Sequence, residues 1–368
     1  MDLRREQRER KRAACGNELT SFALAVAIAL VAVACDGGNG TRPNEDVPAT
    51  ESPTMVPETR AGLSFGDPRT AATRDLFEVE VEHGEYWRMF TLDRFDGETW
   101  TSTNPDGSEG GIRLSAPTIL PRSGAASPHQ AETLDQTFLI LSDFETAHAL
   151  LMAQTAEEIT GPIGDITWDP ARSQAFIDGQ LEAGMEYTVR SRIAVPTPED
   201  LDQVDHLPRS TSLEWTELPA GLDPRIEDIA ERWTADATSD YRKVLAIQQH
   251  FHNGDFIYST DVDTAVDADS LVDFLTRTRT GFCVHYSSAM AVMVRALGLP
   301  ARIGVGFRAG TRQRDGTYLV RTTDAHVWVE VLFAGYGWLQ FEPEPGPIPH
   351  PNARPGTYLN PVAPTDPP

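Results

Sequence analysis

The sequence predicts an α+β protein in which a β-rich region, residues 70–196, precedes a region of helices followed by strands, residues 222–346. In the first region, short stretches alternate apolar and polar residues, which is typical of half-buried strands. In the second, apolar residues recur at helical spacing before alternating stretches return. A chain of 368 residues is long enough for both regions. The fold class therefore follows from changes of hydrophobic period along the chain.

The first 35 residues have the features of a signal peptide or membrane anchor. A basic stretch, residues 1–12, precedes an uncharged apolar run, residues 21–34, which is short for a membrane span and typical of a signal sequence. Cys35 follows and resembles the acylated cysteine of bacterial lipoproteins, although Ala32 stands where a leucine is usual. A lipid anchor at Cys35, a cleaved signal and a single anchor helix all stay open. Each places the rest of the chain outside the cytoplasm, in the cell envelope or secreted, because the basic flank comes first.

Composition defines three connecting segments. Residues 36–69 form a polar tether rich in Gly, Pro, Ser and Thr, and residues 347–368 form a Pro-rich tail; both are expected to be disordered. Residues 197–221 form a linker rich in Pro, Asp and Glu.

The net charge of −24 comes from 31 basic and 55 acidic residues. Nucleic-acid binding needs a basic surface that displaces counterions, so this charge argues against a nucleic-acid partner. The acidic residues are dispersed, which indicates a solvated surface.

The β-rich region begins with an alternating stretch in which Phe77, Val79 and Val81 share one face. A second strand pattern follows and reaches a turn at Asp96-Gly97. We expect structural roles for Trp87, Arg88, Asp93 and Asp96. The later strand patterns are residues 137–144, 147–154 and 184–195.

The helical region is expected to begin with Asp223 as N-cap and Pro224 in the first turn. A further helix opens at Cys283 and ends near Gly298 and Pro300, with a buried stripe along one face. The other predicted elements are helices over 241–253 and 267–279, and three or four strands over 302–346.

Cys283 is predicted to be a free thiol, because the other two cysteines, Cys15 and Cys35, precede the folded regions. A free thiol is unusual in an exported domain. Gly281 permits a tight entry into its helix, where unpaired N–H groups and the helix dipole favour an anion. We therefore expect a lowered pKa for Cys283 and a reactive thiolate. The alternative is a buried, inert cysteine.

His326 projects from an alternating strand that is followed by a hairpin. If the hairpin loop comprises residues 334–336, Glu342 lies opposite Trp328 and diagonal to His326, about 7–8 Å away between backbone positions. A carboxylate there would hold the imidazole tautomer and stabilise the imidazolium. Cys283, His326 and Glu342 then supply the groups of a thiolate–imidazolium nucleophile. A register change of one residue would turn Glu342 to the other face, in which case Asp324 is the fallback carboxylate.

A zinc site is the competing interpretation of these residues. Its ligands would come from His250, His252, Cys283, His285 and His326. An HxH pair on a helix places its rings on different faces, and no tight ligand spacing is present, so no metal is predicted. We expect His285 to be structural or to line the cleft.

Four stretches together resemble the transglutaminase-like superfamily: "GFC", "RALGLPARIGVGF", "DAHVWVEV" and "GWLQFEPEPG". Residues 240–346 cover that core. The resemblance implies a papain-like fold, with helices packed on an antiparallel sheet and a Cys-His-Asp arrangement. Cys283 matches the nucleophile, His326 the base, and Glu342 stands for the usual aspartate. The family's "DPT" reads "EPE" here, so Glu344 replaces a threonine.

Residues 86–100 resemble the segment upstream of the core in bacterial, membrane-anchored, TgpA-like transglutaminases. Those relatives carry several N-terminal membrane helices and another after the core, whereas this chain has one short apolar segment. It therefore looks like the extracytoplasmic portion alone.

The resemblance implies acyl transfer from a glutamine carboxamide through a Cys283 thioester, which an amine or water resolves. The Cys283 backbone N–H would bind the oxyanion, and Gln248, Tyr258 and Trp328 are candidates for its side-chain partner or for the cleft wall. Proteins or cell-wall peptides are the expected substrates, with no cofactor. A cysteine peptidase or amidase on the same residues, or a silent envelope-binding module, stays open.

Overall fold

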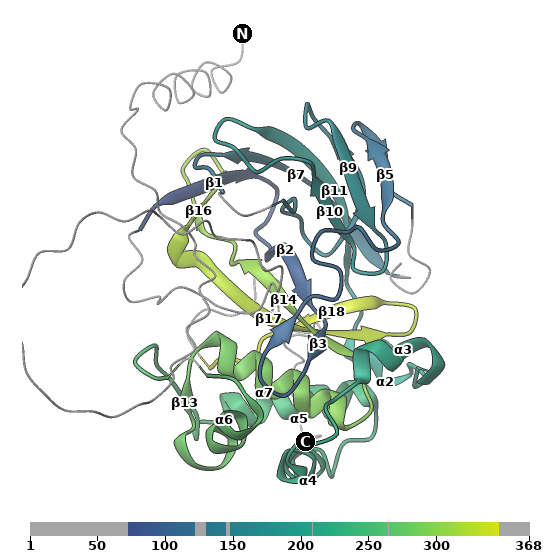
Figure 1. Cartoon of the computed structure of the whole chain (residues 1–368), viewed down its shortest axis with the longest axis vertical. Helices are drawn as coiled ribbons and strands as arrows, with labels where there is room; N and C mark the ends of the chain where they lie inside the picture. The colour runs from purple at the N-terminus through teal and green to yellow at the C-terminus, as the bar shows by residue number, and fades with distance from the viewer. Residues whose placement is uncertain (1–72, 122–129, 145–147, 208, 264, 346–368) are drawn as a thin grey trace, which may run out of the picture.

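The computed structural model describes residues 73–121, 130–144, 148–207, 209–263 and 265–345. The predicted α+β fold class is confirmed: antiparallel sheets dominate the first half, and helices followed by strands form the second (Figure 1). The predicted export segment with Cys35, the predicted tether and the predicted tail lie outside the described residues. In the part of the chain that is described, no helix is both long and apolar enough to cross a membrane.

Two sheets form most of the upper part of the molecule in Figure 1. The larger has the strand order β15 (Thr311–Arg312), β16 (Tyr318–Arg321), β1 (Asp75–Glu80), β7 (Ala131–Ile140), β11 (Glu186–Ala194), β8 (Thr155–Thr160) and β6 (Thr118–Ile119). The smaller consists of β10 (Gln174–Ile177), β9 (Asp165–Asp169) and β5 (Ile112–Ser115). As predicted, Phe77, Val79 and Val81 are buried in the core of this part.

The predicted strand over residues 147–154 is wrong. Its described part forms only isolated bridges, Ala149 with Phe176 and Met152 with Arg88. These two partners belong to different sheets, β10 and β2. A strand needs a continuous ladder with one neighbour, so this apolar stretch crosses between the sheets instead.

The helices lie together at the other end of the molecule (Figure 1). Asp223 caps its helix as predicted, because its side chain accepts a hydrogen bond from Arg225 N, and Pro224 occupies the first turn. The predicted linker contains the first two helices of the described residues. The helices are α2 (Pro198–Asp202), α3 (Arg209–Thr216), α4 (Pro224–Trp233), α5 (Asp240–His252), α6 (Ala268–Asp273), which continues as a π-helical turn (Phe274–Thr278), and α7 (Cys283–Ala296).

Helix α7 is more deeply buried than its sequence pattern predicts. Residues 283–295 are all buried, not one stripe alone. One side of the helix packs against strand β17 and the other sides against α4 and α5. Gly298 ends it with a φ of +78°, a conformation that favours glycine. A helix enclosed in this way gives Cys283 a rigid position.

The sheet beneath α7 joins the two predicted regions. It is antiparallel, with the order β18 (Gly337–Phe341), β17 (Ala325–Phe333), β14 (Ala301–Phe307) and β2 (Trp87–Leu92). Strand β2 comes from the predicted β-rich region, while β15 and β16 of the second region join the seven-stranded sheet. The two regions therefore exchange strands, which brings residues before β2 next to the end of β18.

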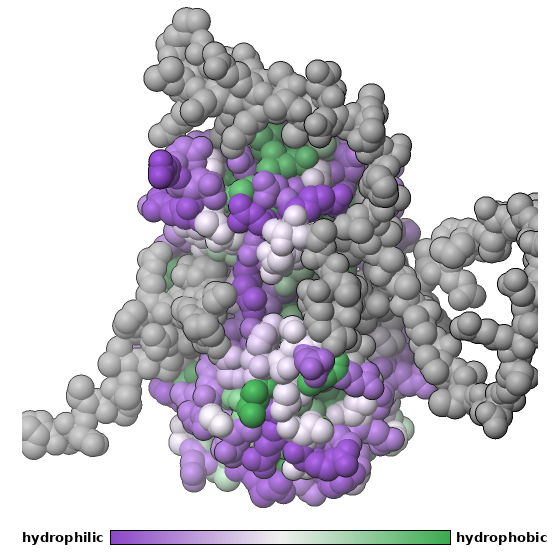
Figure 2. Space-filling view, turned by 90° about the vertical axis from the view of Figure 1, so that its left-hand side faces the viewer, coloured by the Kyte–Doolittle hydropathy of each residue, from purple (hydrophilic) through white to green (hydrophobic). Residues whose placement is uncertain are grey.

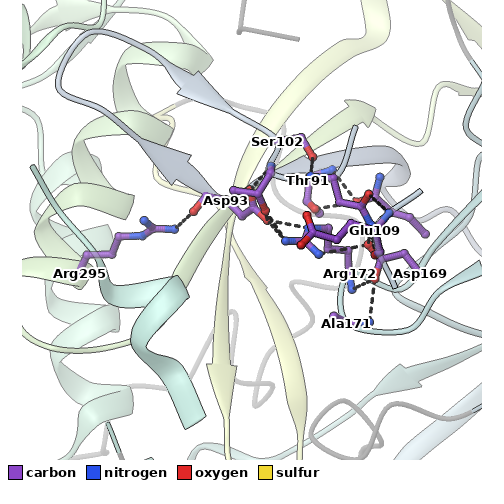
Figure 3. Close-up of polar contacts among 11 residues, drawn as sticks. Thr91, Asp93, Ser102, Glu109, Asp169, Ala171, Arg172 and Arg295 are labelled. Carbon is purple, nitrogen blue, oxygen red and sulfur yellow. Dashed lines mark hydrogen bonds and ion pairs between the residues drawn. The ribbon is translucent and has the colours of Figure 1, made fainter. Parts of the chain in front are cut away.

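A buried polar network links the strand-exchanged regions next to β2 (Figure 3). Arg172 bonds Asp93 and Asp169, and Arg295 of α7 donates to the backbone oxygen of Asp93 at 2.6 Å. Asp93 follows β2 and precedes the hairpin of β3 (Arg94–Phe95) and β4 (Trp100–Thr101). In the hairpin turn, Asp96 accepts hydrogen bonds from two backbone N–H groups. Asp93 and Asp96 thus have the structural roles predicted for them.

The surface agrees with the interpretation of the acidic charge. Figure 2 shows hydrophilic residues over much of the described part of that face, with smaller hydrophobic patches. Among the described residues, the exposed large apolar side chains include Ile257 and Tyr258, which are 61% and 44% exposed. These two residues form strand β12 (Ile257–Tyr258), which pairs with Thr280 and Gly281 just before Cys283.

Candidate active site

Cys283 is the first residue of α7 and a free, buried thiol. The chain enters through β13 (Thr280–Gly281), which pairs in parallel with β12 (Ile257–Tyr258), and through Phe282, which is extended. A Cβ atom on Gly281 would lie 2.8 Å from Cβ of His285, so glycine is required for this entry, as predicted. The Phe282 N–H points to Nδ1 of His285 at 3.4 Å, which gives His285 a structural role.

His326 and Glu342 meet as the predicted register requires. Strands β17 and β18 pair Val329 with Phe341, so that Glu342 follows opposite Trp328 and the loop comprises residues 334–336. Nε2 of His326 lies 2.5 Å from Oε2 of Glu342, and His326 is fully buried. The imidazole is thereby held in one orientation, with Nδ1 as its other ring nitrogen.

Tyr86, far from Glu342 in sequence, also contacts this pair of residues. Its hydroxyl donates a hydrogen bond of 2.6 Å to Oε2 of Glu342, and its ring lies edge-on to His326 with 5.3 Å between centroids. The sequence interpretation missed this residue. The available signal was its place as the first residue of the TgpA-like segment just before β2.

Helix α5 fixes the backbone of Glu342. Oε1 of Gln248 accepts a hydrogen bond from Glu342 N at 3.0 Å, and Nε2 of His252 contacts Glu342 O at 2.8 Å. Gln248 and His252 are one helical turn apart and face the same way. They therefore position the carboxylate. His252 was considered only as a zinc ligand in the sequence.

Glu344 lies close to Cys283 and His326. One ligand atom from each of Cys283, His326 and Glu344 lies within 4.8 Å of the others. Glu344 accepts a hydrogen bond of 2.6 Å from Arg308, which follows β14, and its backbone N–H donates to Oε1 of Glu342 at 3.0 Å. In the described part of the chain, Nδ1 of His326 has no hydrogen-bond partner. This nitrogen is therefore the one left to act on Cys283.

The expected lowering of the Cys283 pKa is wrong. Burial raises the pKa of the thiol to about 12, and the Glu344 carboxylate adds to this, while Arg308 and a hydrogen bond from the Val327 backbone oppose it. Cys283 thus needs a base to take its proton at neutral pH.

Glu342 is well suited to stabilise such a base. Burial opposes its ionisation, but the charge and hydrogen bond of His326 and the Tyr86 hydroxyl lower its pKa to about 2. Burial, together with Glu342, raises the pKa of Tyr86, which therefore stays a neutral donor. Glu342 is accordingly a carboxylate at neutral pH. It is bonded to the His326 imidazole, the group placed to act as a base toward Cys283.

The other candidates have varied positions. Tyr258 pairs with Gly281, two residues before Cys283, and burial, Glu344 and Cys283 raise the pKa of Tyr258 to about 12. Trp328 is fully buried, and its indole N–H donates to Glu330 at 3.2 Å. Asp324 accepts a hydrogen bond from Arg321 N, and the structure gives the His326 contact to Glu342 instead.

The five possible zinc ligands are not all brought together. His250 stacks on Trp233 with 4.6 Å between ring centroids, and His252 and His285 have the contacts described above. Cys283, His326 and Glu344 form the group that could hold a metal ion among the described residues. Glu344 of this group is also ion-paired with Arg308 at 2.6 Å.

Comparison with known proteins agrees with this geometry. Residues 227–343 match the family described as the transglutaminase-like superfamily, and residues 1–198 match the TgpA N-terminal domain. A protein-glutamine gamma-glutamyltransferase of Pseudomonas aeruginosa is 30% identical over 295 residues, which is 79% of this chain and 40% of that protein. The uncharacterized protein YebA of Bacillus subtilis is 28% identical over 305 residues, 77% of this chain and 40% of that protein.

The chain thus spans about 40% of the length of these curated relatives. A solved structure is also similar: the periplasmic domain of TgpA from Pseudomonas aeruginosa bound to ethylmercury. It is 26% identical with a TM-score of 0.55, and the match covers 74% of this chain and 90% of that one. The match to the TgpA N-terminal domain covers more than half of this chain. The chain therefore belongs to the transglutaminase-like superfamily, as a protein of the TgpA type.

Proposed function

We propose that this protein is an extracytoplasmic cysteine acyltransferase that attacks the carboxamide of a glutamine side chain and forms a thioester at Cys283. The observation that carries the proposal is the chain of contacts from Tyr86 and Glu342 to His326, which ends at an open Nδ1 beside Cys283. The relative described as a protein-glutamine gamma-glutamyltransferase and the match to a periplasmic domain support it.

In the first half-reaction, Nδ1 of His326 takes the thiol proton as the sulfur attacks the carboxamide carbon. Base catalysis is needed because the pKa of Cys283 is about 12. Glu342 stabilises the imidazolium that results. His326 then returns the proton to the departing nitrogen. The C–N bond breaks, ammonia leaves, and the acyl group stays on Cys283 as a thioester.

In the second half-reaction, a primary amine or water attacks the thioester carbon and gives a proton to His326. The C–S bond breaks, and the proton returns to the sulfur. An amine yields a cross-linked or amidated product, and water yields a glutamate. The same steps on a peptide bond would give a cysteine peptidase. The acyl donor, a glutamine carboxamide or a peptide bond, therefore decides between these activities.

The oxyanion of each tetrahedral intermediate would be bound by the Cys283 backbone N–H and the Tyr258 hydroxyl. Strand pairing fixes Tyr258 beside Gly281, and a hydrogen bond from Ser259 N to Gly281 O at 2.7 Å supports that position. The raised pKa of Tyr258 keeps its hydroxyl protonated, as a donor must be.

The test measures ammonia release and fluorescent-amine incorporation by the full chain with glutamine-containing peptides, beside Cys283→Ala and His326→Gln. We expect both signals in the unmodified protein and neither in the two variants. Peptide cleavage without ammonia release would assign a peptidase. Absence of all three activities, with a folded protein, would contradict the enzyme proposal and favour an envelope-binding module.

A further inference from the structure

The Glu344 carboxylate lies in the active site but takes no part in the hydrogen bonds that orient His326. Its side chain is 10% exposed, and it lies within 4.8 Å of the sulfur of Cys283 and a ring nitrogen of His326. Burying a carboxylate is costly unless it is paired. Glu344 also raises the pKa of the nucleophile, which opposes thiolate formation. A negative group in this place therefore has a cost for the first half-reaction.

One of the two carboxylate oxygens of Glu344 is hydrogen-bonded. Oε1 accepts from Arg308 at 2.6 Å, and the backbone N–H donates to Glu342 at 3.0 Å, which fixes the residue. Within the described residues, Oε2 of Glu344 is buried and has no hydrogen-bond partner. A held carboxylate thus leaves one acceptor open close to the reacting sulfur.

The charges around this acceptor favour a cation. Glu342 and Glu344 are negative, and Arg308 is positive. Cys283 and His326 together add no charge, whether as thiol and imidazole, as thiolate and imidazolium, or with Cys283 in a thioester. The summed charge of these groups is −1. An incoming ammonium group would therefore be attracted, and an incoming carboxylate would be repelled.

We propose that the open oxygen of Glu344 binds the ammonium group of the acyl acceptor and so selects a cationic primary amine over uncharged amines and water. This inference rests on the proposed function, because an acyl acceptor is needed only if Cys283 forms a thioester. It assigns Glu344 to acceptor specificity and Arg308 to positioning the carboxylate.

The proton balance is complete with groups on this chain. The Glu344 carboxylate accepts one proton from the ammonium group, which leaves a neutral amine that attacks the thioester. The attacking nitrogen gives its second proton to His326, the C–S bond breaks, and His326 returns that proton to the sulfur. Glu344 then releases its proton to solvent. Burial, with a contribution from Glu342, raises the pKa of Glu344, which suits this transfer.

The first experiment measures local charge and does not depend on turnover. Cys283 in the full chain is modified with two thiosulfonate reagents, one bearing an ammonium group and one a sulfonate. The Cys283 peptide is followed by mass spectrometry because the chain has two further cysteines, Cys15 and Cys35. The ratio of the two rates cancels changes in the thiol pKa. We expect Glu344→Gln to lower the cation-to-anion ratio by roughly tenfold and Arg308→Gln to raise it.

Glu98→Gln is the matched control, since it removes the same charge from the exposed β3–β4 turn and is expected to leave the ratio unchanged. A ratio that Glu344→Gln does not move overturns the inference, whether or not the protein is active. A lowered ratio in a protein that neither releases ammonia nor incorporates amine overturns the proposed function instead and leaves the cation site in place.

The second experiment compares acceptors, with a lysine derivative as the cation and hydroxylamine as an uncharged amine. We expect Glu344→Gln to lower kcat/KM for the lysine derivative by about tenfold relative to kcat/KM for hydroxylamine, through KM. Glu344→Asp should recover part of the preference. An equal loss with both acceptors would overturn the inference and give Glu344 a structural role.

Discussion

Two buried carboxylates near strand β17 have different surroundings. Glu330 lies between Arg88 and Arg302, at 3.0 and 2.8 Å, and its oxygens are fully occupied. Glu342 is also fully bonded, but to Tyr86 and His326, and the far nitrogen of that imidazole, Nδ1, has no hydrogen-bond partner among the described residues. The first cluster ends in fixed cations, and the second ends in a group that can exchange a proton.

The pKa shifts show the same difference. Burial opposes the ionisation of both carboxylates, and the pKa of each is lowered by its partners: Arg88 and Arg302 for Glu330, His326 and Tyr86 for Glu342. Arginine keeps its charge throughout the physiological range, so the Glu330 cluster cannot gain or lose protons. Buried charge alone therefore does not identify a reactive site. An open, titratable atom at the end of a bonded chain does.

The largest expected effect is on catalysis by Glu342→Gln. Glutamine keeps the shape of the side chain but cannot stabilise the imidazolium, so kcat for ammonia release should fall by about 10³–10⁴. The melting temperature should stay near that of the unmodified protein. Glu342→Asp, which restores the carboxylate, is the control. A loss in kcat below tenfold would mean that the two clusters do not differ in function.

Glu330→Gln should affect stability instead. Removing the carboxylate leaves Arg88 and Arg302 buried without a counter-charge, which should lower the free energy of unfolding by about 3–5 kcal/mol. Urea denaturation measures this, with Glu98→Gln as the exposed control. We expect kcat of the folded fraction to change by less than about threefold, since Glu330 does not contact His326. A stable variant with lost activity would reverse the comparison.

Tyr258→Phe tests the proposed oxyanion donor. Removing this hydroxyl should lower kcat by about 10². Alkylation of Cys283 by iodoacetamide forms no oxyanion, so its rate should stay within about twofold and serves as the internal control. If both rates fell together, Tyr258 would support the position of Cys283 and would not bind the oxyanion.

The smallest expected effect is on the pH dependence of Cys283. Because the Glu344 carboxylate raises the pKa of the thiol, Glu344→Gln should lower that pKa and enlarge the thiolate fraction at every pH below it. The alkylation profile with iodoacetamide should move to lower pH, with a several-fold faster rate near pH 7. Arg308→Gln should move it the other way. Identical profiles would show that Glu344 does not influence the sulfur.

Much of the site could be predicted because it depends on short-range patterns. Gly281 and the apolar spacing after it placed Cys283 at a helix start, and the hairpin length set the register of Glu342 against Trp328. Hairpin pairing is local, so one loop of three residues fixed which side chain shares a face with His326. The predicted strand at residues 147–154 failed because its partners are in two different sheets.

The sequence by itself determined the helix that begins at Cys283, the strand carrying His326 and the place of Glu342, since each follows from the chemistry of neighbouring residues. Only the tertiary structure decided that Tyr86 bonds Glu342, which is 256 residues away in sequence. That contact requires strand β2 of the first region to join the sheet that contains β17 and β18. The tertiary structure also reversed the expected pKa of Cys283. Burial and the Glu344 carboxylate, which follows strand β18, raise this pKa, and neither effect is visible in the local sequence.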